Sequence, residues 1–198
     1  KCGTSNPENS WKTASAPVKK FSPVRVDVKD MQYLYEEGNA LVCMKKLEEA
    51  IASFDHAIEI NPDYVEAKWN KALALLLDGQ FGEGWPLFEW RWKYKKFTSP
   101  KRDFLAPLWL GNESLNGKTI LLHAEQGLGD TIQFCRYAKL VKALGAKVVL
   151  EVPKTLAILL CSLEGVDELI EHGKPLPFFD FHIPLLSLPL AFKTDISN

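Results

Sequence analysis

The residues best suited to chemistry lie in one short run, His123-Ala124-Glu125-Gln126-Gly127-Leu128-Gly129-Asp130. Glycines let the backbone approach a ligand closely, and free amides at the start of a helix favour a negatively charged group. The neighbouring polar side chains add further contacts. We therefore predict a ligand-binding loop formed by His123, Glu125, Gln126, Gly127 and Gly129. A structural, hydrogen-bonded role is the alternative for His123.

The glycine spacing of this loop limits the ligands that it predicts. Gly127 and Gly129 form a G-x-G pattern without the third glycine of a dinucleotide fingerprint. No Gly-Lys-Ser/Thr follows, so the loop is not of the Walker type and nucleotide hydrolysis is disfavoured. The chain also shows no metal-ligand spacing and no triad pattern, so we expect no metal ion.

The loop must be positioned by the elements around it. Residues 119–123 form an apolar run typical of a buried parallel strand, and residues 131–144 form an amphipathic helix that Gly145 closes. A strand at 147–152, a helix at 154–163 and a strand at 166–170 follow. This alternation predicts a parallel sheet with helical crossovers.

The segment 178–183 predicts one more strand, because apolar and polar residues alternate along part of it. Asp180 and His182 lie in this segment. Both are candidates for reaching the same cleft as the loop.

The N-terminal part of the chain repeats itself at an offset of 34 residues, the period of a helix-turn-helix repeat. The first copy, residues 31–64, resembles the tetratricopeptide repeat. Small and large residues fall at that family's positions, and a proline ends the second helix: Gly38, Leu41, Ala50, Phe54, Ala57 and Pro62. The resemblance implies that the repeats bind a protein or peptide.

The second copy, residues 65–98, is degenerate and its second helix is rich in aromatic residues. One interpretation is a binding surface on which Arg91 or nearby lysines stack on indoles. The other is that the tryptophans dock the repeats onto the following domain, and we favour it because so much apolar surface is usually buried. The basic residues from Lys93 to Lys96 are expected to form a solvated helix end.

The run from Gly117 to Phe134 looks like the opening of glycosyltransferase-like domains that follow tetratricopeptide repeats in bacteria. These domains are similar to heptosyltransferases, which are built from two Rossmann-like domains. The similarity extends from about Gly117 to Phe192 and covers only the first of the two domains. The resemblance implies a nucleotide-sugar donor and a glycan or protein acceptor if the chain is part of a complete enzyme.

The resemblance also implies a catalytic role for Asp130, because heptosyltransferases are proposed to use the aspartate after this glycine to deprotonate the acceptor hydroxyl. A nearby carboxylate is a suitable base for that step. The alternative is that Asp130 caps the following helix and that Gln133 completes a capping box. The two roles are compatible.

Composition excludes several classes of protein. The formal charge is −1 over 198 residues, so there is no global attraction to nucleic acid. No stretch reaches the roughly 20 apolar residues of a transmembrane helix. The four cysteines are scattered without a CxxC pair, which favours a reducing cytoplasm.

We therefore expect an α + α/β fold, with tetratricopeptide helical hairpins followed by a Rossmann-like parallel-sheet half-domain. The expected boundaries are a flexible lead-in at 1–27, the repeat module at 28–97, a connector at 98–116 and an incomplete Rossmann-like domain at 117–198. The sequence ends where the first domain is still being completed, so we expect the donor-binding domain to be missing from this chain.

Three functions remain open from sequence alone. The first is the acceptor-side half of a bacterial glycosyltransferase-like enzyme, truncated and not catalytic as this fragment. The second is a noncatalytic protein–protein interaction module with an α/β scaffold. The third is a small-ligand or nucleotide-binding enzyme that uses the loop from Gly127 to Asp130. No cofactor is expected.

Overall fold

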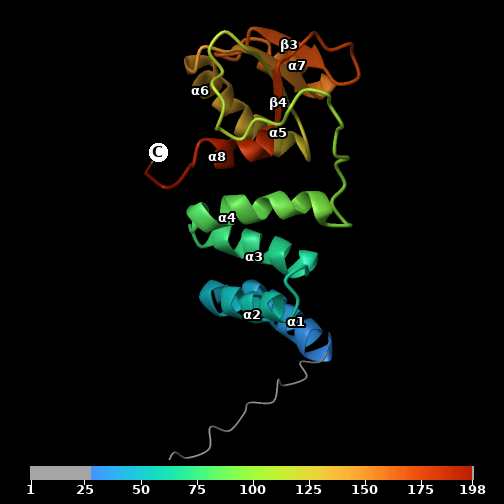
Figure 1. Cartoon of the computed structure of the whole chain (residues 1–198), viewed down its shortest axis with the longest axis vertical. Helices are drawn as coiled ribbons and strands as arrows, with labels where there is room; N and C mark the ends of the chain where they lie inside the picture. Colours follow the sequence, from blue (N-terminus) through green and yellow to red (C-terminus); the bar gives the residue numbers. More distant parts are fainter. Residues whose placement is uncertain (1–27, 198) are drawn as a thin grey trace, which may run out of the picture.

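The computed structural model describes residues 28–197, and the predicted lead-in at 1–27 lies outside them. Four helices stack at one end of the molecule, and a parallel sheet with its helices forms the other end (Figure 1). The architecture is therefore α + α/β, as the sequence predicts.

Two helical hairpins form the repeat module. Their helices are α1 (Val28–Cys43), α2 (Leu47–Ile60), α3 (Val65–Leu77) and α4 (Phe81–Phe88). Gly38 lets α1 approach α2 closely, because an added Cβ there would lie 2.5 Å from the buried ring of Phe54. Small buried residues do the same along α2 and α3: Ala50, Ala57, Ala67 and Ala74.

The aromatic helix of the second repeat is shorter than its sequence pattern indicates. The α-helix ends at Phe88 and continues as a 3₁₀ turn, η1 (Glu89–Lys93). Arg91 lies in this turn, and its side chain is completely buried. The solvated lysines expected after it are exposed at Lys93, Lys95 and Lys96.

The α/β half contains four strands, β1 (Thr119–His123), β2 (Lys147–Val152), β3 (Glu168–Glu171) and β4 (Phe181–Pro184). All neighbouring strands are parallel, and their order is β3-β2-β1-β4. The predicted strand at 166–170 begins two residues later, and that at 178–183 begins three residues later. The residue just before each strand already donates a backbone hydrogen bond to its neighbour, Asp167 to the Val148 carbonyl and Asp180 to the Thr119 carbonyl.

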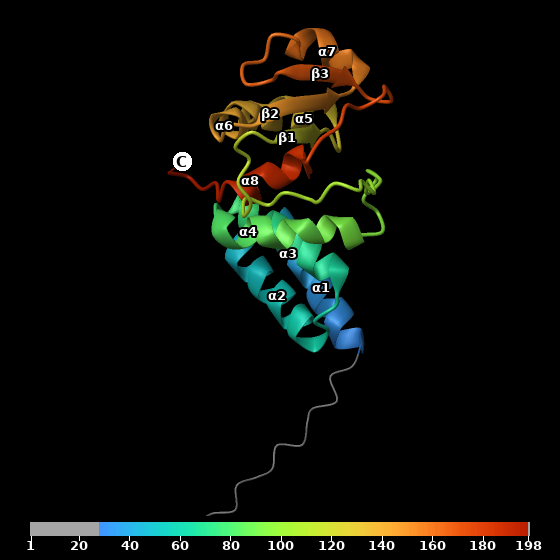
Figure 2. The same ribbon diagram turned by 45° about the horizontal axis from the view of Figure 1, so that its top comes forward.

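The helices of this half are short. They are α5 (Leu128–Phe134), η2 (Cys135–Tyr137), α6 (Ala138–Ala143), α7 (Lys154–Leu160), η3 (Leu185–Ser187) and α8 (Leu188–Ala191). The single helix predicted at 131–144 thus begins at Leu128 and is interrupted by a 3₁₀ turn. Helix α8 lies between α4 and the sheet, so the two halves are in contact (Figure 2).

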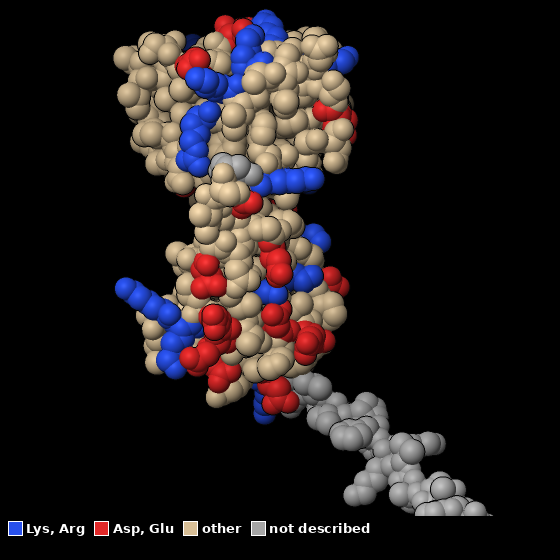
Figure 3. Space-filling model, turned by 90° about the vertical axis from the view of Figure 1, so that its left-hand side faces the viewer, with Lys and Arg blue, Asp and Glu red and all other residues tan. Residues whose placement is uncertain are grey.

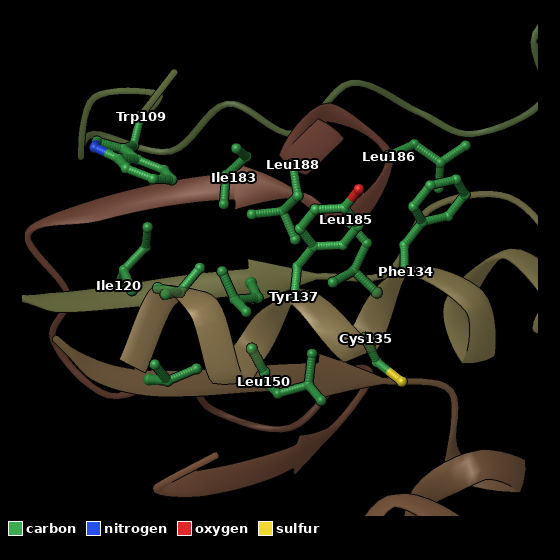
Figure 4. Packing of buried hydrophobic residues seen from close by; sticks show 14 of the residues in the cluster. Trp109, Ile120, Phe134, Cys135, Tyr137, Leu150, Ile183, Leu185, Leu186 and Leu188 are labelled. Atoms are coloured by element: carbon green, nitrogen blue, oxygen red, sulfur yellow. The ribbon is translucent and has the colours of Figure 1, made fainter. Parts of the chain in front are cut away.

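Alternate strand residues point to opposite faces of the sheet. One face carries Ile120, Leu150 and Ile183, which belong to the large core together with Trp109 and Tyr137 (Figure 4). The other face carries a smaller cluster in which Leu121, Val149 and Ile170 are covered by Phe104, Leu176 and Phe179. Phe104, which belongs to the connector, therefore covers part of this second face.

Candidate functional site

The strand order places a topological switch point between β1 and β4. Strands β2 and β3 lie on one side of β1, while β4 lies on the other. Ligands of open α/β sheets bind at the carboxyl ends of the strands at such a point. His123 ends β1 and His182 lies in β4, so both are close to this position.

The two histidines contact each other on the face of the sheet that the connector covers. His123 Nε2 lies 3.2 Å from His182 Nδ1, which is hydrogen-bonding distance. The side chain of His123 is 3% exposed, and its Nδ1 atom has no hydrogen-bond partner among the described residues. The ring of Phe104 packs on both, with centroids 5.5 Å from His123 and 4.8 Å from His182.

Both imidazoles are held in the neutral form. Burial lowers the pKa of His123 to about 3, and electrostatic interactions with His182 and Arg102 lower it further. Burial, with Arg102 and Lys101, also lowers the pKa of His182. At neutral pH both rings are therefore uncharged, and one hydrogen bond joins them.

Two adjoining cavities open beside this pair. One, of about 390 Å³, lies between the connector and the strand ends, and the other, of about 440 Å³, lies beside the loop after β1. Trp92, Arg102 and His123 line both. Glu125 and Gln126 line only the second, and the Gln126 backbone N–H donates to Ser99 Oγ at 2.8 Å.

The sequence gives little local signal for Arg102, Phe104 and Glu151, which complete this region. Glu151 on β2 is 1% exposed and forms an ion pair with Arg102. It belongs to the same face as His123 because the two are paired in register across β1 and β2. Only a connector that folds back over the sheet brings Arg102 to it.

Glu125 lies at the edge of the second cavity, but its carboxylate is used in a buried ion pair. Its Oε1 accepts a hydrogen bond from Arg91 Nη2 at 2.8 Å. Arg91 also donates to Ser187 Oγ at 2.7 Å and to Glu89 Oε1 at 2.6 Å. Burial raises the pKa of Glu125, and Arg91 opposes that rise. This network ties the repeat module to the loop and to η3.

Asp130 occupies the third position of α5, whose N-cap residue is Gly127. The prediction that Asp130 is itself the N-cap is therefore wrong, because the helix begins earlier than expected. Asp130 still caps the helix, since its Oδ2 accepts a hydrogen bond from the Gly127 N–H at 3.2 Å. Gly129, between them, has open space around its Cα.

The carboxylate of Asp130 borders a different cavity from that of the histidines. This groove, of about 850 Å³, lies between the last repeat hairpin and α5. Leu73, Leu77 and Trp85 line it from the repeats, while Asp130 and Gln133 line it from the α/β half. The loop thus separates two cavities on opposite sides of the sheet.

Asp180 does not lie in either cavity. Its carboxylate accepts hydrogen bonds from the Thr119 N–H at 2.8 Å and from Lys118 Nζ at 3.4 Å, at the amino end of β1. The Thr119 N–H is the main reason that the pKa of Asp180 is lowered. The prediction that Asp180 reaches the cleft is wrong, because β4 begins only after it and runs away from it toward the switch point.

The aromatic residues of the second repeat divide between two roles. The Trp85 indole donates to the Thr194 carbonyl at 3.1 Å and its ring meets Phe134 edge-on, so this residue docks the repeats onto the α/β half. Trp92 instead borders the two histidine cavities and lies over the Arg91 guanidinium. Trp90 is contacted by Lys68 and Lys93.

Over residues 28–197 no group of three or more His, Cys, Asp and Glu side chains is arranged to hold a metal ion. Within the same described range, no helix has the length and apolar character needed to cross a bilayer.

Comparison with known proteins assigns the helical part of the chain. Residues 38–79 match the family model described as the TPR repeat, that is, the tetratricopeptide repeat. This part of the chain contains a tetratricopeptide repeat. The match spans the end of α1 through α3, which the 34-residue period predicts to be helical.

Two curated proteins resemble the chain over short stretches. Protein FlbA of Caulobacter vibrioides is 33% identical over 84 residues, covering 42% of this chain and 14% of that protein. An uncharacterized protein of Methanocaldococcus jannaschii is 39% identical over 57 residues, covering 29% of this chain and 66% of its own. The chain therefore spans less than two thirds of each relative.

Among solved structures, a mutant O-GlcNAc transferase of Thermobaculum terrenum is similar in part. The two chains are 18% identical with a TM-score of 0.33, and the match covers 73% of this chain and 28% of the other.

Proposed function

We propose that this tetratricopeptide repeat protein is the acceptor-side part of a bacterial glycosyltransferase-like enzyme. In this proposal the repeats hold a protein or peptide, and Asp130 takes a proton from an acceptor hydroxyl. The observation that supports it is the groove of about 850 Å³ that the last repeat hairpin and the start of α5 share. An acceptor lying along the repeats would meet Asp130 without leaving this groove.

The lining of the groove fits a segment with apolar side chains and one reacting hydroxyl. Leu73 and Leu77 on α3 are exposed there, at 38% and 68%. Asp130, Gln133 and Arg136 supply polar groups at the other wall. Pockets of this kind combine apolar walls with a few polar groups that fix orientation.

The reaction would be transfer of a sugar to that hydroxyl. The acceptor oxygen forms a bond to the anomeric carbon, the bond from that carbon to the donor's phosphate breaks, and Asp130 receives the hydroxyl proton. The resemblance to heptosyltransferases implies a nucleotide-sugar donor held mainly by a second Rossmann-like domain. The described residues supply the acceptor side only.

The first hairpin suggests the charge of the partner. Residues 28–64 contain eight Asp or Glu residues and three Lys residues. Acidic side chains gather over the repeat module in the space-filling view (Figure 3). Complementary charge steers association, so we expect a basic segment in the partner. We further place the protein in the cytoplasm, in keeping with its free cysteines at 43, 135 and 161.

The test is sugar transfer by the natural full-length protein carrying Asp130→Asn. Loss of a general base lowers turnover roughly 10²- to 10⁴-fold. Asparagine keeps an oxygen that can accept the Gly127 N–H, so the helix cap survives. Glu164→Gln, the same chemical change at an exposed carboxylate paired with Lys139, is the matched control and should leave turnover unchanged. Equal turnover in Asp130→Asn and the native protein would remove Asp130 from the mechanism.

A noncatalytic interaction module is the second candidate, and one observation favours it: the Asp130 carboxylate is already engaged as a helix cap. This function predicts that Leu77→Asp, in the groove, abolishes partner binding while Asp130→Asn leaves it intact. Transfer activity in the full-length protein that depends on Asp130 would exclude a purely noncatalytic role.

A further inference from the structure

We propose that the cavity between the connector and the carboxyl ends of β1 and β4 is a second binding site, for a small neutral ligand rich in hydroxyl groups. This histidine cavity lies on the opposite side of the sheet from the Asp130 groove. The proposal does not depend on any catalytic role for Asp130.

The first observation is a buried polar atom without a partner. His123 Nδ1 is enclosed and makes no hydrogen bond within the described residues, while Nε2 of the same ring is engaged by His182. Leaving such a buried atom unsatisfied is unfavourable. The same residue lines the adjoining cavity, and a ligand hydroxyl or an ordered water that reached this atom from there would satisfy it. Both are neutral groups that donate and accept.

The histidine pair itself selects for hydroxyl groups. One hydrogen lies between His123 Nε2 and His182 Nδ1, and either ring can supply it. If His123 donates, its Nδ1 is an acceptor and His182 Nε2–H is a donor; if His182 donates, the two outer roles exchange. In both tautomers the pair presents one donor and one acceptor. A hydroxyl group matches either arrangement, whereas an oxyanion only accepts.

The surrounding charges argue against an anionic ligand. Arg102 is paired with Glu151 and Arg91 with Glu125, and both carboxylates are buried. Their positive charges are therefore balanced within the protein, and Lys101 and Asp103, which also line the cavity, carry opposite charges. The low pKa of His123, about 3, also means that this ring carries no positive charge to attract an anion at neutral pH.

The walls of the cavity suit a compact ligand with apolar faces between its hydroxyls, such as a saccharide unit. Phe104 and Trp92 supply aromatic rings, and the volume of about 390 Å³ lies in the range of small-molecule sites. A single sugar ring would contact the aromatic walls with its C–H groups and the histidines with its hydroxyls.

The connector wall is fixed before any ligand binds. The His182 N–H donates to the Pro107 carbonyl at 3.1 Å, and the Trp109 N–H donates to the His182 carbonyl at 2.9 Å. Leu108 forms a parallel bridge to His182. These bonds hold the segment that carries Arg102 and Phe104 against β4, so the cavity is pre-formed and binding does not have to order it.

The test is imidazole ¹⁵N NMR of the full chain with two probes, methyl glucoside and inorganic phosphate. We expect methyl glucoside to shift the ring resonances of both His123 and His182, with a dissociation constant on the order of 1 mM. Phosphate should leave them unchanged. No shift with methyl glucoside, or a shift with phosphate alone, would overturn the proposal.

Variants separate this site from the rest of the protein. His182→Gln removes the ring of His182, the half-buried member of the histidine pair, and should weaken methyl glucoside binding about tenfold. Circular dichroism checks that the variant is folded. Lys139→Gln, an exposed control, should bind as the native chain does. Asp130→Asn should also leave the histidine shifts intact, so failure here is distinguishable from failure of the transferase proposal. Unaltered affinity in His182→Gln would contradict the assignment.

Discussion

Arg91 in the 3₁₀ turn that ends the repeat module and Glu125 in the loop after β1 form an ion pair whose side chains are 0% and 3% exposed. The two residues are 34 positions apart in the sequence, with Arg91 in the repeat half of the molecule and Glu125 in the α/β half. Ser187 and Glu89 complete its hydrogen bonds. The orientation of the repeats relative to the sheet edge therefore depends on a buried polar network as well as on apolar packing.

Arg91→Met should destabilise the protein strongly. It leaves the Glu125 carboxylate buried without its partner, and breaking a buried pair in this way costs about 3–5 kcal/mol. The free energy of unfolding, measured by urea denaturation, should fall by that amount. The double variant Arg91→Met with Glu125→Gln should recover much of the loss, because the buried Glu125 side chain is then neutral, while the Glu89 side chain is 21% exposed and keeps its hydrogen bond from Ser187.

The control for Arg91 is an ion pair of similar length on the surface. Lys139 and Glu164 are joined at 2.9 Å, but their side chains are 65% and 75% exposed. Lys139→Met should therefore change the free energy of unfolding by only about 0–1 kcal/mol. A loss in Arg91→Met no larger than that of Lys139→Met would show that the buried network contributes little to stability.

Gly38→Ala should destabilise the repeat module although alanine favours helices. The new Cβ would lie 2.5 Å from Cε1 of Phe54, a buried ring held between α1 and α2. Overpacking of this kind costs about 1–3 kcal/mol. Thermal unfolding followed by circular dichroism measures it.

Gly82→Ala is the matched control for Gly38, because Gly82 also lies in a helix and nothing is within 4 Å of its added Cβ. Alanine there should raise stability by up to about 0.5–1 kcal/mol. If both substitutions stabilise the protein, the close approach of α1 to α2 is not a constraint on residue 38.

Much of the fold follows from local patterns. The 34-residue period and the close pairing of small with large residues predict the hairpins. The apolar run before Gly127 and the strand–helix alternation predict the parallel sheet. The boundaries shift where hydrogen bonding decides them, as at α5, which Leu128 begins because Asp130 caps from inside the helix.

The candidate site was less predictable, because its main contacts join distant residues. The strand pattern places His182 in β4, but the same pattern also included Asp180, which binds the amino end of β1 instead. Nothing near Arg91 in the sequence indicates its burial, since its partner lies in another domain. Arg102 and Phe104 come from the connector, whose path over the sheet has no periodic signature.

The neutral, buried state of His123 predicts a loss of stability in acid. Its pKa is about 3 in the folded chain and about 6.5 when unfolded, so the unfolded state binds the additional proton. Stability from this group is full above pH 6.5 and is lost as pH falls toward 3. Over that window the free energy of unfolding should fall by up to about 1.4 kcal/mol per pH unit.

Urea denaturation at pH values across that window measures the effect of His123. His123→Gln should flatten the pH dependence, because the group that takes up the proton is gone. His56→Gln, at an exposed histidine of α2, should leave the slope as it is in the native chain. An identical slope in His123→Gln would assign the acid sensitivity to other groups.

Asp130→Ala and Asp130→Asn should separate the capping role of this residue from any catalytic role. Alanine removes the acceptor for the Gly127 N–H and should cost about 1 kcal/mol of unfolding free energy. Asparagine keeps an oxygen acceptor and should cost much less. Because both variants lack a carboxylate, transfer activity should fall in both if Asp130 is the base. If activity survives in Asp130→Asn and falls only in Asp130→Ala, Asp130 contributes through the helix cap alone and not as a base.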